Sequence, residues 1–218
     1  MKLWTIVPVK PWNLAKSRLD PLFSRAQREA LAAAMLHHVL DVLTTAPVKL
    51  GVLVVSRDTR ALAEARDYGV QTVLESGSPA LNPALTRAAQ LTRTMGATST
   101  LVLPADLPLF SVEDLEALVN LACQSERAVV LASDRHGDGT NALLTCPPGV
   151  IAYAFGPGSF ARHKALAEKA QADVYEWHSP RVALDIDTPD DLACYRALAE
   201  ELGEPLIMPE LLALAADC

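Results

Sequence analysis

The sequence of 218 residues lacks any long apolar run. No stretch approaches the roughly eighteen consecutive apolar residues of a membrane-spanning helix. The first residues, MKLWTIVPVKP, have no small-residue cleavage site, so we interpret them as a first strand and not as a signal peptide. With 50% hydrophobic and 21% charged residues, the composition is that of an ordinary globular protein, and we expect no association with a membrane.

Cysteine is scarce, and common cofactor motifs are absent. The four cysteines, Cys123, Cys146, Cys194 and Cys218, form no CxxC pair and have no histidine at metal-ligand spacing. We therefore expect free thiols, a cytoplasmic location and no zinc site. The sequence contains neither GxGxxG nor GxxxxGK[ST], which argues against a dinucleotide-binding Rossmann site and against a P-loop.

Basic residues are also fewer than acidic ones. The formal net charge is −7 and there is no basic stripe, so we expect no nucleic-acid partner. None of the five histidines stands at triad spacing from a serine or cysteine. A reaction in which the attacking group is already an anion, such as a substrate phosphate, needs no such base.

Short β-rich runs alternate with amphipathic helical stretches along most of the chain. The predicted strands are residues 3–9, 52–55, 70–74, 100–103 and 128–132, and the predicted helices are 24–43, 59–68, 81–95 and 111–123. This alternation predicts an α/β fold in three layers, with a doubly wound, mostly parallel sheet.

The pattern changes after Ser133, where glycines and prolines become frequent. Here we expect a small antiparallel β insertion, a helix at residues 159–170, strands at 174–177 and 182–186, and a helix from Thr188. We expect one domain over residues 1–203 and a C-terminal tail, 204–218, which could pack as a short helix.

Three aspartates are candidates for a metal site. Asp106 lies between apolar residues after a predicted strand, where it is either an Asx-turn residue or a magnesium ligand. Asp185 and Asp187 are two apart on a predicted strand, so their side chains would share one face about 6.5–7 Å apart. Because Mg²⁺ prefers oxygen ligands, these two aspartates could share an ion with Asp106.

Asp190 and Asp191 have a different interpretation. Thr188 is a good N-cap, and Pro189 suits the first position of a helix. We therefore expect both aspartates to cap the helix that begins here.

Basic and glycine-rich segments could bind anions. Lys10, Lys16 and Arg18 follow the first strand and form either a solvated basic loop or a cradle for a polyphosphate. The segments GDGTN at 137–141 and GPGSF at 156–160 are either tight turns or anion nests. Ser159 could also cap the following helix, and Asn82 is an N-cap candidate because Pro83 follows it.

Several motifs occur in a characteristic order. They are PVK at 8–10, AKSRL at 15–19, LN at 81–82, PADLPL at 104–109, DGTNAL at 138–143, FGPGSF at 155–160 with His163, and DIDTPDDL at 185–192. Over about residues 3–200 the sequence resembles the 2-phospho-L-lactate / phosphoenolpyruvate guanylyltransferases of deazaflavin coenzyme F-420 biosynthesis. The pair formed by DGTNAL and FGPGSF is the most specific part of this resemblance.

The resemblance implies a Rossmann-like, GT-A-like nucleotidyltransferase fold of the molybdenum-cofactor-guanylyltransferase kind. It implies transfer of GMP from GTP to a phosphorylated three-carbon acid, phosphoenolpyruvate or 2-phospho-L-lactate, with release of pyrophosphate. The implied roles are Mg²⁺ binding for Asp106, Asp185 and Asp187, phosphoacid binding for Thr140, Asn141, Gly156 and Ser159, and nucleotide binding for Pro8, Lys10, Lys16, Arg18 and Asn82. Lys16 would also take part in catalysis.

Other functions remain open at this stage. The acceptor could be 3-phosphoglycerate, or the protein could be a molybdenum-cofactor or sugar-phosphate nucleotidyltransferase. A non-catalytic nucleotide-binding module would release no pyrophosphate with any acceptor. A homodimer is compatible with the sequence, which carries no signal for the oligomeric state.

Overall fold

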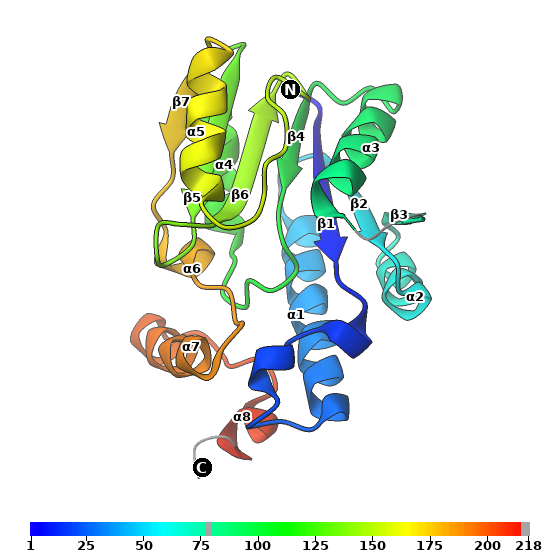
Figure 1. Cartoon of the computed structure of the whole chain (residues 1–218), viewed down its shortest axis with the longest axis vertical. Coiled ribbons are helices and arrows are strands. Elements are labelled where there is room, and N and C mark those ends of the chain that lie inside the picture. Colours follow the sequence, from blue (N-terminus) through cyan, green and yellow to red (C-terminus); the bar gives the residue numbers. More distant parts are fainter. Residues whose placement is uncertain (77–79, 215–218) are drawn as a thin grey trace.

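A single mixed sheet runs through the middle of the protein (Figure 1). The computed structural model describes residues 1–76 and 80–214, and within them the sheet has seven strands in the order β3-β2-β1-β4-β6-β5-β7. The strands are β1 (Leu3–Val9), β2 (Leu50–Ser56), β3 (Gln71–Leu74), β4 (Ser99–Val102), β5 (Ala128–Ser133), β6 (Thr140–Cys146) and β7 (Asp173–Glu176). β6 is antiparallel to β4 and β5, and the other neighbours are parallel. The predicted mostly parallel sheet is confirmed. The expected antiparallel part is β6, which lies inside the main sheet.

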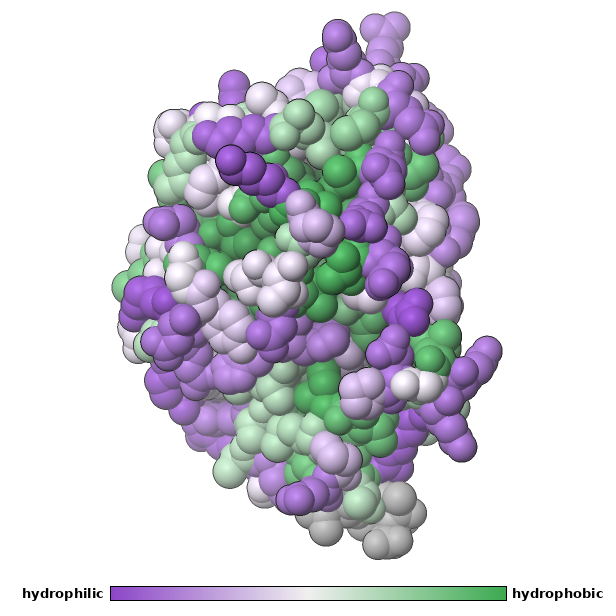
Figure 2. Space-filling view, turned by 180° about the vertical axis from the view of Figure 1, so that it is seen from behind, coloured by the Kyte–Doolittle hydropathy of each residue, from purple (hydrophilic) through white to green (hydrophobic). Residues whose placement is uncertain are grey.

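Helices cover both faces of the sheet, as the alternating pattern predicted. One face packs against α1 (Arg25–Thr45), α2 (Thr59–Asp67), α4 (Val112–Ala122) and α6 (Pro180–Ala183). The other face packs against α3 (Leu81–Thr94) and α5 (Ser159–Lys169). Seen from behind, the molecule shows apolar side chains gathered between polar ones (Figure 2).

The longest helix, α1, begins at a capping box. Ser24 and Gln27 form a capping box, in which each side chain bonds to the other residue's backbone N–H. Leu31, Met35 and Val39 then recur at helical spacing and are buried. Between β1 and α1 the chain forms two short 3-10 helices, η1 (Trp12–Leu14) and η2 (Ser17–Leu19).

The C-terminal segment packs on the body of the protein. It contains α7 (Pro189–Leu202) and α8 (Pro209–Leu214), and the buried side chains of Leu211 and Leu212 join a core cluster with the first half of α1. The short helix expected in the tail is therefore confirmed. Cys123, Cys146 and Cys194 are free thiols as expected, whereas Cys218 lies outside the described residues. Among the described helices, none is long and apolar enough to cross a membrane.

The strand expected at residues 182–186 is wrong. The Ser179 hydroxyl accepts a hydrogen bond from the Val182 N–H and starts α6, after which the chain is extended from Leu184. Leu184 and Ile186 are buried while Asp185 and Asp187 are half-buried, so the alternation in the sequence is real. An extended segment buried on one side has the same period of two as a strand, without any sheet partner.

One edge of the sheet collects the candidate functional residues. β1 and β4 are parallel, so the loops that follow them leave from the same edge. Because β6 runs in the opposite direction, its first residues, Thr140 and Asn141, lie at that edge too. The direction of β6 thus brings the glycine-rich loops to the loops that carry Lys16 and Asp106.

Candidate active site

Three carboxylates meet at this edge of the sheet. Asp106 lies in the loop after β4, and Asp185 and Asp187 lie in the extended segment between α6 and α7. One oxygen from each lies within 4.8 Å of the others, and all three residues are half-buried. The buried Ile186 fixes this arrangement, because its N–H donates to the Asp106 carbonyl oxygen at 3.3 Å. The predicted grouping of the three aspartates is confirmed as geometry, although not on a strand.

The two interpretations of Asp106 can now be separated. Its carboxylate accepts a hydrogen bond from Lys16 and from no backbone N–H of the described residues, so it is not an Asx-turn residue. The ionised form of Asp185 carries an electrostatic cost. Burial, together with the nearby charge of Asp106, raises the pKa of Asp185 to about 6. The Asn141 amide offsets part of this cost by donating to Asp185 Oδ1 at 3.1 Å.

Lys16 is the cation inside this cluster. Its Nζ lies 2.7 Å from Asp106 Oδ2 and 3.1 Å from Asp187 Oδ1, and its side chain is only 6% exposed. Burial alone would lower the pKa of Lys16, but the two carboxylates outweigh burial and the pKa is raised. Burial likewise opposes the ionisation of Asp187, but the charge of Lys16 prevails and the pKa of Asp187 is lowered. Lys16 therefore stays charged and neutralises part of the site.

The other predicted nucleotide-binding residues surround this cluster. Lys10 and Arg18 are exposed, and both charges act on Asp187. Pro8 is half-buried within β1, opposite Val55 of β2. The loop after β1 therefore presents two exposed cations beside the carboxylates and one buried cation among them.

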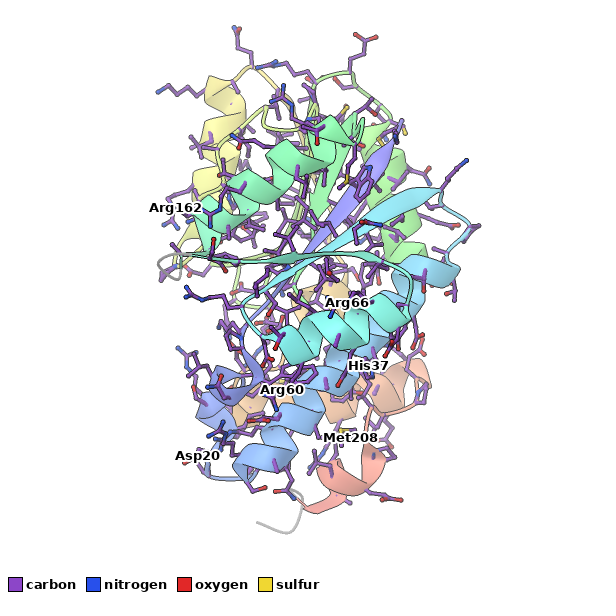
Figure 3. All side chains as sticks on the ribbon, turned by 90° about the vertical axis from the view of Figure 1, so that its right-hand side faces the viewer. Asp20, His37, Arg60, Arg66, Arg162 and Met208 are labelled. Atoms are coloured by element: carbon purple, nitrogen blue, oxygen red, sulfur yellow. The ribbon has the colours of Figure 1, made fainter. Side chains whose placement is uncertain are left out.

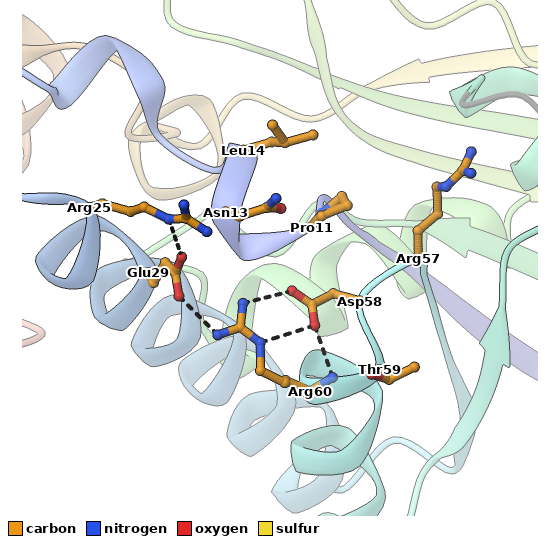
Figure 4. A pocket seen from close by; sticks show the side chains of 9 residues that line it. All are labelled: Pro11, Asn13, Leu14, Arg25, Glu29, Arg57, Asp58, Thr59 and Arg60. Carbon is orange, nitrogen blue, oxygen red and sulfur yellow. Dashed lines mark hydrogen bonds and ion pairs between the residues drawn. The ribbon is translucent and has the colours of Figure 1, made fainter.

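Aromatic and charged contacts hold the loop after β1 in place. The Trp12 N–H donates to Asp58 Oδ2 at 3.0 Å, and the Arg60 guanidinium lies 5.3 Å from the centroid of the Trp12 ring. Arg60 also pairs with Glu29 of α1 at 3.0 Å. The side chains of Asp58, Arg60 and Glu29 are part of the lining of an open cavity of about 520 Å³ (Figure 4). The hydrogen bond and the ring contact of Trp12 tie the loop that carries Lys16 to the start of α2, and the Arg60–Glu29 ion pair ties α2 to α1.

The two glycine-rich segments form one unit at the start of α5. Gly158 donates its N–H to Asp138 Oδ2 at 2.9 Å, and Phe160 donates to the Asp138 carbonyl oxygen at 3.1 Å. The side chain of Asp138 therefore occupies part of the expected anion nest, which the sequence did not predict because the partners are 20 residues apart. The Gly156 N–H, at a residue with φ of 125°, has no partner among the described residues.

Ser159 does not cap α5, contrary to expectation. Gly158 is the N-cap, with a left-handed φ of 69°, and Ser159 is the first helical residue. The Ser159 hydroxyl instead donates to Thr140 Oγ1 at 3.0 Å, and both side chains are buried. Arg162, labelled in Figure 3, supports the same loop, because its Nη2 donates to the Ala154 carbonyl oxygen at 2.8 Å and its Nη1 contacts the Pro157 carbonyl oxygen.

Asn82 is not an N-cap either. α3 begins one residue earlier, with Ala80 as a cap that makes no side-chain bond. Asn82 Nδ2 donates to the Phe155 carbonyl oxygen at 3.1 Å, and Asn82 Oδ1 accepts from the Phe155 N–H at 2.8 Å. Asn82 thus joins α3 to the segment before Gly156.

The capping role of Asp191 is confirmed. Thr188 and Asp191 form a capping box at α7, and Arg135 pairs with Asp191 at 2.8 Å. Asp191 Oδ2 also accepts from the Asp187 N–H at 3.1 Å, which links the cap to the acidic cluster. Asp190 is exposed in the first turn of α7, where its charge favours the helix N-terminus.

The fold is the Rossmann-like fold of the nucleotidyltransferases. A solved structure from Desulfovibrio desulfuricans G20, assigned to the nucleotide-diphospho-sugar transferases, shares this fold with a TM-score of 0.77 and 16% identity. The alignment covers 100% of this chain and 98% of that chain.

Sequence comparison identifies the family within this class. The chain belongs to the family described as guanylyl transferase CofC-like, which matches residues 3–195. A phosphoenolpyruvate guanylyltransferase of Conexibacter woesei is 40% identical over 91% of this chain and 89% of its own length. A 3-phospho-D-glycerate guanylyltransferase of Colwellia psychrerythraea is 32% identical over 94% of this chain and 97% of its own.

Proposed function

We propose that this protein transfers GMP from GTP to the phosphate of phosphoenolpyruvate, with Mg²⁺ as its cofactor. The observation that carries the proposal is the cluster of Asp106, Asp185 and Asp187 at the sheet edge where β6 also begins. The family and the name of the relative from Conexibacter woesei support the transfer and the acceptor. The implied place in coenzyme F-420 biosynthesis, the cytoplasmic location and a homodimer belong to the same proposal as predictions.

The reaction needs alignment and charge neutralisation more than proton transfer. An oxygen of the acceptor's phosphate attacks the α-phosphorus of GTP and forms the new P–O bond. The bond from the α-phosphorus to the oxygen that bridges it to the β-phosphate breaks, and pyrophosphate leaves with that electron pair. The nucleophile is already an anion, so no side chain has to remove a proton.

The donor set fits a magnesium ion. Three carboxylates present hard oxygen ligands, and burial together with the nearby charge of Asp106 raises the pKa of Asp185, so a bound cation would favour its ionised form. When bound, Mg²⁺ supplies charge neutralisation and orientation of phosphate oxygens. Lys16 compensates the charges of Asp106 and Asp187, and the exposed Lys10 and Arg18 would attract the triphosphate.

Thr140, Ser159 and Gly156 would hold the acceptor. The Thr140 hydroxyl proton and the Gly156 N–H have no acceptor among the described residues and can donate to phosphate or carboxylate oxygens, whereas the Ser159 hydroxyl donates to Thr140 and supports it. A second acceptor, 3-phosphoglycerate, is favoured by the relative from Colwellia psychrerythraea, whose name specifies that acid.

The test supplies GTP and Mg²⁺ with phosphoenolpyruvate, 2-phospho-L-lactate or 3-phosphoglycerate in separate reactions. We expect pyrophosphate release with phosphoenolpyruvate, and a product whose mass equals that of the acid plus GMP. Faster turnover with another acid would reassign the acceptor. No pyrophosphate with any of the three would refute the proposed activity and favour a nucleotide-binding module.

A further inference from the structure

His163 of α5 is buried directly behind the proposed acceptor site. The side chain is 0% exposed, and its Nδ1 lies 3.0 Å from Thr140 Oγ1. On the other side of the ring, the Ala154 N–H donates to Nε2 at 2.9 Å. The ring of Phe155 packs edge-on against it at 4.8 Å between centroids. The histidine is thus bonded through both nitrogens and cannot turn without breaking a bond.

These partners determine which ring nitrogen carries the proton. A backbone N–H can only donate, so Nε2 must present its lone pair to Ala154. Burial, together with the charge of Arg162, lowers the pKa of His163 to about 4, so the ring is neutral at pH 7. A neutral imidazole carries one N–H, which must then be on Nδ1, and Nδ1 donates to Thr140 Oγ1.

The bonding of Thr140 follows from this tautomer. A hydroxyl oxygen has two lone pairs and one proton. Thr140 Oγ1 accepts from His163 Nδ1 and from the Ser159 hydroxyl, which uses both lone pairs. The described residues provide no acceptor for the proton of Thr140. Thr140 is 6% exposed at the start of β6, next to Asn141, which donates to Asp185.

We propose that His163 is a positioning residue that makes the Thr140 hydroxyl an obligatory donor to an anionic oxygen of the acceptor. The inference rests on the proposed function, in which Thr140 binds the phosphoacid. In the other neutral tautomer, the proton of His163 would be on Nε2. Thr140 could then donate its hydroxyl proton to Nδ1, and its oxygen would present a lone pair to the anion. His163 thus makes the position next to the Thr140 hydroxyl selective for an anionic group, although the histidine does not contact that group.

Two substitutions separate the two bonds of the ring. In His163→Asn, the amide nitrogen can take the place of Nδ1 and donate to Thr140, while the bond from Ala154 is lost. In His163→Gln, the longer side chain reaches the place of Nε2 and can accept from Ala154, while the donation to Thr140 is lost. Each variant keeps one bond, so they are matched controls for each other.

We expect His163→Gln to raise the KM for phosphoenolpyruvate about tenfold, which corresponds to about 1.4 kcal/mol of lost binding. The KM for GTP and kcat should change less than about threefold, and His163→Asn should stay within that range for all three constants. In a Thr140→Val background, His163→Gln should add no further loss, because the hydroxyl that it orients is gone. Equal losses in the Asn and Gln variants, or a full additional loss in the Thr140→Val background, would overturn the proposal.

A spectroscopic test uses the unmodified protein and does not depend on turnover. In ¹⁵N-histidine-labelled protein at pH 7, long-range ¹H–¹⁵N correlation spectra distinguish the two neutral tautomers and the imidazolium, and His163→Gln assigns the signal. We expect the Nδ1–H form. An Nε2–H form or an imidazolium would refute the proposal even in an active enzyme. If the wild-type protein releases no pyrophosphate with any acid, the proposed function fails, and the role assigned to Thr140 fails with it.

Discussion

Asp106 links the buried lysine to the acidic cluster. It accepts a hydrogen bond from Lys16 at 2.7 Å and shares the cluster with Asp185 and Asp187. We expect Asp106→Asn to lower kcat at least about 100-fold, equivalent to about 2.7 kcal/mol, because the amide keeps the shape but loses the charge. Pyrophosphate release measures the rate, and thermal unfolding checks that the fold is intact.

Asp190→Asn is the matched control for that substitution. Asp190 carries the same group, but it is exposed in the first turn of α7 and lies outside the acidic cluster. It should keep nearly full activity. An active Asp106→Asn enzyme, or an inactive Asp190→Asn enzyme, would contradict the assignment of Asp106 to the site.

His163 should make the stability of the protein depend on pH. Its pKa falls from an ordinary value of 6.5 to about 4 in the folded state, so between these values the unfolded chain binds the extra proton. Stability is therefore unaffected above pH 6.5 and is lost as the pH falls toward 4. We expect a contribution of about 2 kcal/mol to be lost between pH 7 and pH 5.

Urea unfolding at the two pH values measures this effect. Asp185, whose pKa is raised to about 6, titrates in the same interval, and its effect on stability has the opposite sign. The wild type must therefore be compared with a variant that retains Asp185. His163→Gln serves, because it removes the titrating imidazole and leaves Asp185 in place. If wild type and variant lose stability equally between pH 7 and pH 5, the low pKa of His163 is wrong.

At the scale of elements, the cap of α7 stabilises both a helix and the segment that carries Asp185 and Asp187. The Thr188 hydroxyl donates to Asp191 Oδ2 at 2.8 Å and accepts from the Asp191 N–H at 3.3 Å. We expect Thr188→Val to cost about 1 kcal/mol of stability, as loss of an N-cap usually does. Activity should fall too, because Asp191 also accepts from the Asp187 N–H. Thr188→Ser retains the hydroxyl and should behave as wild type in denaturant unfolding and in turnover.

The elements show why the sequence predicted so much of the fold. Strands and helices up to residue 133 have clear periods of two or 3.6, and each period reflects burial on one side of a local element. Residues 182–186 show the alternation of a strand but pair with no other strand among the described residues. Burial of one side of an extended segment is enough to produce this alternation. The place of β6 between β4 and β5 depends on pairing with residues far along the chain, which no local pattern encodes.

Side-chain roles were harder to predict than elements. The fold class correctly places Asp106 at the end of a parallel strand, whereas Asp185 and Asp187 reach the same place from an extended segment that the Ile186 N–H joins to Asp106. Asn82 and Ser159 were assigned to caps from their neighbours in sequence, but their side chains bond to Phe155 and Thr140. Local composition predicts what a residue can bind, whereas long-range packing decides which partner is within reach.

At the scale of the whole molecule, the acidic cluster should couple metal binding to global stability. A ligand that binds only the folded state stabilises it by RT ln(1 + [L]/Kd), which is about 1.4 kcal/mol at tenfold excess over Kd. For a chain of this size we expect Mg²⁺ to raise Tm by about 3–6 °C. Burial, and after it the charge of Asp106, raises the pKa of Asp185, and a bound cation would offset both effects.

Asp185→Asn tests this coupling without relying on catalysis. The substituted amide retains an oxygen that can accept from Asn141, so local structure should persist while the charge is lost. Its Tm should be nearly insensitive to Mg²⁺, whereas wild type and Asp190→Asn should both shift. NaCl at the same ionic strength controls for screening, which acts on all exposed charges alike. Equal Mg²⁺ shifts in wild type and Asp185→Asn would place the ion elsewhere, because removing a ligand charge from the true site must weaken binding there.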